Sequence, residues 1–405
     1  MVVGNVVRAI YPEAVALLDS DINYCSFPQL LGDLFLKDAH AIVLAGTHGK
    51  TTTTALTAWL LEYAKKDPGF LIGGVPGNFD RTARAGSGDY FVIEGDEYDT
   101  AFFDKGPKFL HYRPKTAVLT SVEFDHADIY NDLDHVKQSF RKLVRIMPKD
   151  GCLIVRWDDE GARDVAQGAG CTVWRYGPNQ QWDGRVESNN TTTGTMTFSV
   201  LRDQKVIGTF ESSMVGEHNL YNQVAAVAAA IASGIKAEDL AGAFKHFRGI
   251  KRRQEIIGEP GGVTVIDDFA HHPTAVNLTL HALKQRFGDR RLWAVWEPRS
   301  ATSRRATFQE DYAKSFGAAD KIIIATPYNQ EGIPESERFS AQALVRGLTS
   351  RALDAITLPS TAQISATLAA RVAPGDVVAI LSNGGFDGLH QDLLERLNTR
   401  FNEQS

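Results

Sequence analysis

The chain has 405 residues, 43% of them hydrophobic, which is ordinary for a globular protein of two or three domains. Its net charge of -6 provides no basic surface for a nucleic acid, and the apolar stretch VAAVAAAIA from Val224 is too short to cross a bilayer. Three scattered cysteines are too few for a disulfide framework or a zinc site, so we expect a cytoplasmic protein without nucleic-acid or membrane partners.

The first strong structural pattern begins at Ala41. Residues 1–40 are mixed in character and contain no glycine-rich binding loop. From Ala41 to about Met147, short apolar runs (AIVLA, YFVIE and TAVLTS) alternate with stretches of helical spacing. This alternation predicts a parallel sheet covered by helices.

The pattern changes between about Cys171 and Met214. The runs TVWRYG, GTMTFSVL and KVIGTFESS are separated by Thr, Asn and Gly, and they predict an antiparallel flank of the same domain. A helix is expected from about His218 to Ser233, followed by another that ends near Phe247.

A second series of alternating elements follows residue 250. The runs VTVIDD, LWAVWE, KIIIAT, AITLP and VVAILS each precede a helical stretch, which predicts a Rossmann-like doubly wound domain. The sequence therefore favours an α/β fold with three parts. These are a short segment 1–40, a central domain 41–250 with a P-loop ATPase-like parallel sheet and an antiparallel flank, and a C-terminal domain 251–405.

The segment AGTHGKTTT has the features of a phosphate-binding loop. The common loop reads G-x-x-x-x-G-K-[ST]; Gly49, Lys50 and Thr51 match its end, whereas Leu44 takes the place of the first glycine. Gly46 and Gly49 allow a turn whose N–H groups bind an anion at a helix N-terminus. Because a helix terminus contributes only about 0.3–1 kcal/mol, Lys50 and a Thr51-bound Mg²⁺ are expected to carry much of the charge of a triphosphate.

Acidic and imidazole side chains follow the next two predicted strands. Glu94 ends YFVIE and precedes Asp96 and Glu97, and TAVLTS leads into VEFDHAD with Asp125 and His126. Ligands bind at the carboxyl ends of parallel strands, so these groups are expected to share a crevice with the phosphate loop. They are candidate Mg²⁺ partners, although histidine is an unusual magnesium ligand. The alternative is a set of surface carboxylates with a hydrogen-bonded core histidine.

Four further segments carry groups suited to binding a nucleotide or a substrate. An asparagine pair opens a helix, where it could read the edge of a heterocycle or merely cap the helix. Two acids end a strand, and two histidines precede a helix that starts with proline. A basic run between the domains is either solvated or a clamp for phosphate, and an arginine after a strand could bind a carboxylate. The segments are GEHNLYN (Asn219, Asn222), DDFAHHPTA (Asp268, His271), KRR (Arg253) and EPRS (Arg299).

In this order, AGTHGKTTT, EGDEYD, EFDHAD, GEHNLYN and DDFAHHPTA resemble the Mur ligase family of peptidoglycan synthesis, whose phosphate loop has the form G-T-x-G-K-[ST]-T. The resemblance extends from about Ala41 to Phe401. It implies an ATP-driven amide synthesis through an acyl phosphate, with ATP and Mg²⁺ as cofactors. EPRS and LSNGGFDGLH are most similar to the branch that joins L-alanyl-γ-D-glutamyl-meso-diaminopimelate to UDP-N-acetylmuramate in peptidoglycan recycling.

The resemblance also implies roles for individual residues. Lys50 would bind the β- and γ-phosphates, Thr51 and Glu94 would hold one Mg²⁺ with His126 at a second, and His271 would lie near the reacting groups. The implied ATP-binding residues are Gly46, Thr47, His48, Gly49, Lys50, Thr51, Thr52, Asn219, Asn222 (adenine), Arg253 (phosphates) and Asp268 (ribose), and the implied substrate-binding residue is Arg299.

Family members begin with a further domain that binds the UDP moiety, and only a short segment precedes Ala41 here. The resemblance implies that residues 1–40 correspond to the tail of that domain, with RAIYP in place of the family's Arg-Gly-Asn-Pro. Two alternatives stay open. One is a ligase that adds L-alanine to UDP-N-acetylmuramate, and the other is an ATP-binding protein that cannot ligate because the UDP-binding part is missing.

Overall fold

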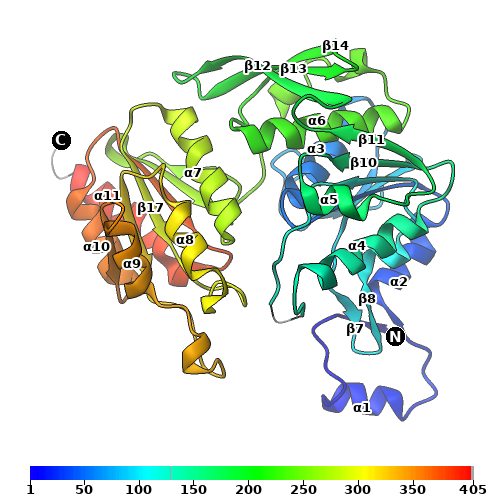
Figure 1. Cartoon of the computed structure of the whole chain (residues 1–405), viewed down its shortest axis with the longest axis horizontal. Helices are drawn as coiled ribbons and strands as arrows, with labels where there is room; N and C mark the ends of the chain where they lie inside the picture. The colour runs from blue at the N-terminus through cyan, green and yellow to red at the C-terminus, as the bar shows by residue number, and fades with distance from the viewer. Residues whose placement is uncertain (128, 403–405) are drawn as a thin grey trace.

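The computed structural model describes residues 1–127 and 129–402. Figure 1 shows two α/β bodies side by side. The body drawn from blue to green is built on a ten-stranded sheet, and the one drawn from yellow-green to red on a six-stranded sheet. Asp128, the last acid of the EFDHAD motif, lies outside the described residues.

The first body contains a mixed sheet. Its strands are β3 (His40–Ala45), β4 (Gly69–Leu71), β5 (Ala83–Arg84), β6 (Tyr90–Gly95), β9 (Thr116–Leu119), β10 (Cys152–Arg156), β11 (Thr172–Tyr176), β12 (Trp182–Asn190), β13 (Thr195–Arg202) and β14 (Lys205–Ser212). They run in the order β14-β13-β12-β11-β10-β9-β3-β6-β4-β5. The central strands from β11 to β4 pair in parallel, whereas β12, β13 and β14 form an antiparallel edge.

Helices cover both faces of this sheet. They are α3 (Lys50–Tyr63), α4 (Leu133–Ile146), α5 (Glu160–Val165) and α6 (Glu217–Ala232). Along β3, Ile42 and Leu44 pack with α3 and α6, and Ala41 and Val43 pack with α4 and α5. Successive side chains of a strand point to opposite faces, and all four are fully buried. Because the strand is buried on both faces, its sequence is a continuous apolar run and does not alternate with polar residues.

Two expectations for this body are corrected, and two strands are added. TVWRYG (β11) pairs in parallel with β10, so it belongs to the parallel sheet and not to the antiparallel flank. The sequence pattern predicts neither β10 nor β12; most of β12 is exposed, so it lacks an apolar periodicity. The expected helix that ends near Phe247 is instead two short 3-10 turns, Ala237–Leu240 and Phe244–His246. Gly242, with a φ of 80°, separates the turns and interrupts the helical path.

The second body has the predicted doubly wound arrangement. Its strands are β15 (Glu255–Gly258), β16 (Thr264–Asp268), β17 (Leu292–Trp296), β18 (Lys321–Ala325), β19 (Ala355–Leu358) and β20 (Val377–Leu381). Its helices are α7 (Pro273–Phe287), α8 (Gln309–Ser315), α9 (Ala341–Thr349), α10 (Thr361–Arg371) and α11 (Leu389–Asn402). The order is β15-β16-β20-β17-β18-β19, parallel except for β15. Helices α7, α8 and α9 pack on one face and α10 and α11 on the other.

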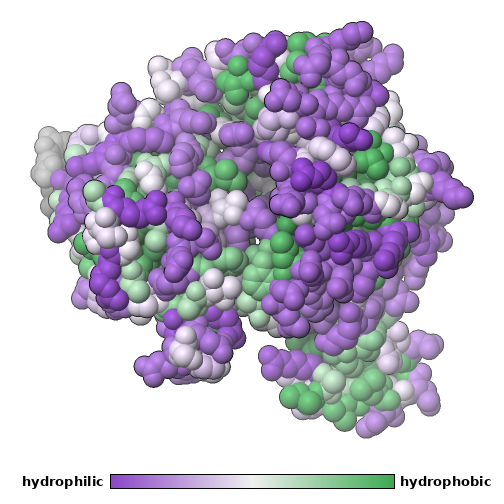
Figure 2. All heavy atoms as spheres, viewed as in Figure 1, coloured by the Kyte–Doolittle hydropathy of each residue, from purple (hydrophilic) through white to green (hydrophobic). Residues whose placement is uncertain are grey.

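The first residues form a small appendage to the central body (Figure 1). It contains β1 (Val2–Val3), α1 (Pro12–Leu18), β2 (Cys25–Ser26), α2 (Phe27–Leu31) and a π-helical turn (Gly32–Leu36), next to a hairpin of β7 (Asp99–Ala101) and β8 (Asp104–Pro107). Many of its apolar side chains are exposed, and Figure 2 shows them as a green cluster below the central body. Among the described residues, no helix has the length and apolar character needed to cross a membrane.

Candidate active site

A cleft of about 1650 Å³ lies between the two bodies. Its walls come from the loops that follow β3, β6, β9 and β16, from the start of α6 and from the connection between the bodies. Four of these segments follow parallel strands at their carboxyl ends, where α/β sheets bind ligands. The predicted site residues that line it are Thr47, His48, Gly49, Lys50, Thr51, Thr52, Glu94, His126, Asn219, Asn222, Arg253, Asp268 and His271.

The phosphate loop turns sharply between β3 and α3. Gly46 and Gly49 have φ angles of 130° and 82°, a region that favours glycine. A Cβ on Gly46 would lie 2.2 Å from Oγ1 of Thr120, and one on Gly49 would lie 2.6 Å from Oδ1 of Asn222. Both positions therefore require glycine. The turn brings the N-terminus of α3 to the cleft, and such a terminus binds anions.

Lys50 is buried at the cleft wall and paired with an acid. Its Nζ donates to the carbonyl of Gly46 at 2.6 Å and to Oε2 of Glu97 at 2.9 Å. Burial alone would lower the pKa of Lys50, but Glu97, Asp96 and Glu94 together raise it above its ordinary value. The ammonium is therefore charged, and it lies where the loop would receive a phosphate.

Glu94 and Thr51 lie together beside the loop. Oγ1 of Thr51 donates to Oε2 of Glu94 at 3.0 Å, and the backbone N–H of Gly73 donates to Oε1 at 2.5 Å. Burial raises the pKa of Glu94 above its ordinary value. Arg253 reaches the same place from the connection between the bodies: its Nη2 is 3.4 Å from Oγ1 of Thr51, and its guanidinium lies 4.5 Å from the ring centre of Phe269.

His126 faces Glu97 and not Glu94. Its Nε2 lies 3.7 Å from Oε1 of Glu97 and 3.0 Å from the hydroxyl of Tyr98. The φ of His126 is 55°, which is uncommon for a residue other than glycine, and its backbone N–H donates to Oδ1 of Asp125 at 2.7 Å. Glu97 therefore connects Lys50 and His126 through its two carboxylate oxygens.

Asp125 lines the cleft and links the two bodies. Its Oδ1 accepts from Oγ1 of Thr302 at 2.8 Å, and its Oδ2 lies 3.7 Å from Nε2 of His126 and 3.9 Å from Nε2 of His271. Burial would raise the pKa of Asp125, but the surrounding histidines hold it well below its ordinary value, so the carboxylate is ionised. Burial lowers the pKa of His271, so its imidazole is neutral at pH 7.

The groups proposed for the nucleoside also line the cleft. Nδ2 of Asn222 is 3.5 Å from Oδ1 of Asn219, one helical turn away in α6, and both side chains are buried. Asp268 accepts hydrogen bonds from the N–H groups of Gln254 (2.7 Å) and Ala270 (2.8 Å). These contacts fix the connection between the bodies against the end of β16.

Arg299 is not among the residues that line the cleft. It follows β17, where its Nη1 lies 3.2 Å from Oε1 of Glu297 and its guanidinium lies 3.8 Å from the ring centre of Tyr328. It packs against the backbone after β20, since a Cβ on Gly384 would lie 2.0 Å from its Nε. Arg299 therefore lies at the carboxyl ends of two adjacent strands of the six-stranded sheet.

The two sheet bodies match known families separately. Residues 44–230 match the Mur ligase middle domain, and residues 252–384 match the glutamate ligase domain of Mur ligases. The chain belongs to the Mur ligase family.

Several relatives of this Mur ligase are known. It is 42% identical over 404 residues to the UDP-N-acetylmuramate–L-alanyl-γ-D-glutamyl-meso-2,6-diaminoheptandioate ligase of Escherichia coli (strain K12), covering 98% of this chain and 84% of the relative. It is 32% identical to the UDP-N-acetylmuramate–L-alanine ligase of Alkaliphilus metalliredigens (strain QYMF), covering 96% and 82%. A crystal structure of a murein peptide ligase from Psychrobacter arcticus 273-4 superposes with a TM-score of 0.69 at 36% identity, covering 98% and 85%.

Contacts of three residues at the site of this Mur ligase do not follow from the sequence. Glu97, expected only as a candidate Mg²⁺ partner, pairs with Lys50, and Glu123 and His272, which had no individual role, lie beside the loop residue His48. Each lies in one of the five family motifs, so treating every ionisable residue of these motifs as a candidate site residue would have included all three. Their partners come from distant segments, which sequence spacing does not reveal.

Proposed function

We propose that this Mur ligase joins the carboxylate of UDP-N-acetylmuramate to the α-amine of L-alanyl-γ-D-glutamyl-meso-diaminopimelate and converts ATP to ADP and phosphate. The observation that carries the proposal is the 42% identity to a ligase named for this reaction, against 32% for the L-alanine ligase. The geometry supports the ATP-dependent part, because a glycine-dependent loop and a charged lysine meet in a cleft between two sheets.

The proposed reaction has two steps. A carboxylate oxygen of the muramate attacks the γ-phosphorus of ATP, ADP leaves, and an acyl phosphate forms. The amine then attacks the acyl carbon, loses a proton, and phosphate leaves with the bonding electrons. Lys50 and Arg253 would neutralise the phosphate oxygens. The neutral imidazole of His271, in the cleft beside Asp125, is proposed to accept the proton of the amine.

Thr51 and Glu94 are proposed to hold a Mg²⁺ ion with the phosphates. Their oxygens lie 3.0 Å apart next to the phosphate loop, and oxygen donors of this kind fit Mg²⁺. The imidazole nitrogen of His126 fits Mg²⁺ less well than an oxygen donor does. His126 faces Glu97, so a second ion near His126 would also be bound by the Glu97 carboxylate. A bound Mg²⁺ supplies charge neutralisation for the β- and γ-phosphates.

The acceptor decides between the two ligase functions. Phosphate release is measured with ATP, Mg²⁺ and UDP-N-acetylmuramate plus either the tripeptide or L-alanine. We expect release that depends on the tripeptide, together with a product of the corresponding mass. Preference for L-alanine would replace the proposal by the L-alanine ligase, and ATP binding without release for either acceptor would support a protein that does not ligate.

Glu94→Ala is expected to raise the Mg²⁺ concentration that gives half-maximal activity by about 10-fold or more, because it removes the charged oxygen donor of the proposed site. The measurement is a Mg²⁺ titration of phosphate release at fixed ATP. Asp99→Ala, which changes an acid paired with Lys105 outside the loop, is the control and should leave the titration unchanged. If Glu94→Ala titrates like the wild type, the metal role moves to Asp96 or Glu97.

Arg299→Lys is expected to raise the KM for the tripeptide by about 10-fold, with a smaller change in the KM for ATP. A lysine keeps the charge but cannot form the planar bidentate contact that an arginine makes with a carboxylate. Arg305→Lys, on the same loop and paired with Glu337, is the matched control. Equal changes in both KM values would argue against a contact with the peptide.

A further inference from the structure

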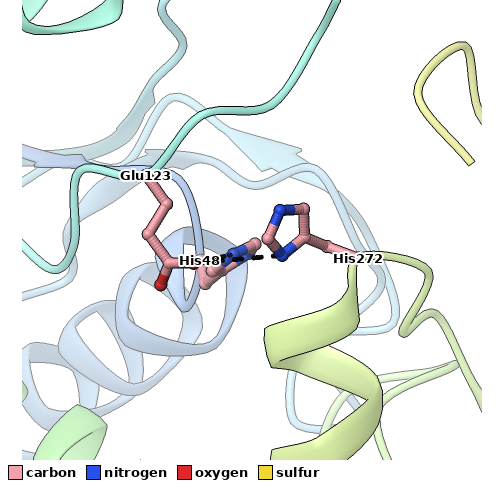
Figure 3. A group of neighbouring side chains, drawn as sticks. All are labelled: His48, Glu123 and His272. Carbon is pink, nitrogen blue, oxygen red and sulfur yellow. Dashed lines mark ion pairs between the residues drawn. The ribbon is translucent and has the colours of Figure 1, made fainter. Parts of the chain in front are cut away.

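Three side chains from distant segments meet beside the phosphate loop. Figure 3 shows His48 from the loop after β3, Glu123 from the loop after β9 and His272 from the start of α7. Nε2 of His48 lies 3.7 Å from Oε2 of Glu123, and Nδ1 of His272 lies 4.0 Å from the same oxygen. One ligand atom from each residue lies within 4.8 Å of the others. Among the described residues, this is the one group of three or more His, Cys, Asp or Glu side chains whose ligand atoms lie close enough together to hold a metal ion.

The hydrogen bonds of His272 leave the nitrogen in this cluster able to act as a ligand. Its Nε2 lies 3.2 Å from the carbonyl oxygen of Phe124, an acceptor only, so Nε2 carries the proton. Nδ1 then carries the lone pair, which accepts the backbone N–H of Thr274 in the cap of α7 over a long distance of 3.3 Å. A metal ion at Nδ1 would replace this weak cap contact. An imidazole that donates its second N–H to a backbone carbonyl has the arrangement typical of metal-binding histidines.

His48 and Glu123 are also suited to a ligand role. Nε2 of His48 is a buried atom that has no hydrogen-bond partner within the described residues. Glu123 is held in place because Oγ1 of Thr274 donates to its Oε2 at 2.7 Å. The rings of His48 and His272 lie 4.6 Å apart, centre to centre, so the two imidazoles already face one region.

We propose that His48, Glu123 and His272 form a binding site for a divalent transition-metal ion of the Zn²⁺ class, separate from the magnesium position at Thr51 and Glu94. Two imidazoles and one carboxylate suit Zn²⁺ or Co²⁺ and not Mg²⁺, which prefers oxygen. Metal–ligand bonds of about 2.0–2.1 Å in a tetrahedron place ligand atoms about 3.3 Å apart. The cluster therefore has to contract, and the fourth position stays open to water or to an anion.

Metal binding at this place would connect the two bodies. His48 and Glu123 belong to the central body, whereas His272 caps the first helix of the C-terminal body. An ion held by all three fixes their relative position next to the phosphate loop. Because the cluster is assembled only in the folded protein, binding also raises the stability of the folded state.

The proposal is tested with Co²⁺ as the probe and with the full chain free of any histidine tag and of nucleotide. We expect one Co²⁺ per chain, the strong visible absorption of a tetrahedral site, and a higher melting temperature. Excess Mg²⁺ should not displace the ion, and Zn²⁺ should. This assay uses no substrate, so its outcome is independent of the proposed ligase function.

Two conservative variants locate the ion. Glu123→Gln keeps an oxygen acceptor for Thr274, and His272→Asn keeps a residue that caps a helix well. Each is expected to weaken Co²⁺ binding at least about 10-fold, because loss of a ligand should cost no less than the loss of a group that only orients one. His281→Asn, on the exposed side of the same helix, is the control and should bind as the wild type does. No visible absorption, or equal affinity in both variants and the control, would overturn the proposal.

Discussion

Lys50→Ala is expected to lower the turnover of ligation by about 10²–10³-fold, the scale on which one preorganised charged or polar partner contributes to a transition state. The reason is the position of its ammonium, which is held in a buried pair at the start of α3 with its charge maintained by three acids. The measurement is the rate of phosphate release with saturating ATP, Mg²⁺ and both substrates.

Lys105→Ala provides the control for this experiment, because Lys105 is exposed and paired with Asp99 away from the loop. It should retain a turnover within about twofold of the wild type, as expected for an exposed pair of small energetic value. Near-normal turnover of Lys50→Ala would contradict the assignment of the phosphate loop. An equal loss of turnover in both variants would indicate a general effect on folding and would contradict a specific role of Lys50.

Glu97→Gln is expected to lower the free energy of unfolding by about 1–3 kcal/mol in the absence of nucleotide, because it removes the acid that hydrogen-bonds the buried ammonium of Lys50 and leaves the charges of Asp96 and Glu94 near it. Both side chains are almost fully buried, with 10% of the Lys50 side chain and 2% of the Glu97 side chain exposed, so the lost charge is only weakly screened. The measurement is urea unfolding followed by circular dichroism. Addition of ATP with Mg²⁺ should restore part of the loss, since the phosphates provide negative charge at the same place.

The double variant Lys50→Met/Glu97→Gln separates this pair from a general effect on packing. It removes both charges, so it should be less destabilised than Glu97→Gln alone. A single variant within about 0.5 kcal/mol of the wild type, a change typical of surface positions, would show that the two groups are not paired in solution. A double variant that is as unstable as the single one would assign the loss to packing.

The two sheets could be predicted because their central strands are buried on both faces. AIVLA and VVAILS are continuous apolar runs, which is the pattern of a strand covered by helices on both sides. The edge of the central sheet could not be predicted in the same way. β12 pairs antiparallel with β13 while most of its side chains face solvent, so its sequence carries no apolar periodicity.

The doubly wound fold class and the loop with Gly46, Gly49 and Lys50 could be predicted from the sequence, because backbone turns and strand periodicity depend on residues that are close together along the chain. The position of acids and histidines after the strands also follows from the sequence. Their partners, Lys50 with Glu97 and His48 with Glu123 and His272, are visible only in the folded structure. These contacts depend on the packing of loops from separate strands and on the closeness of the two bodies, which residue spacing along the chain does not encode.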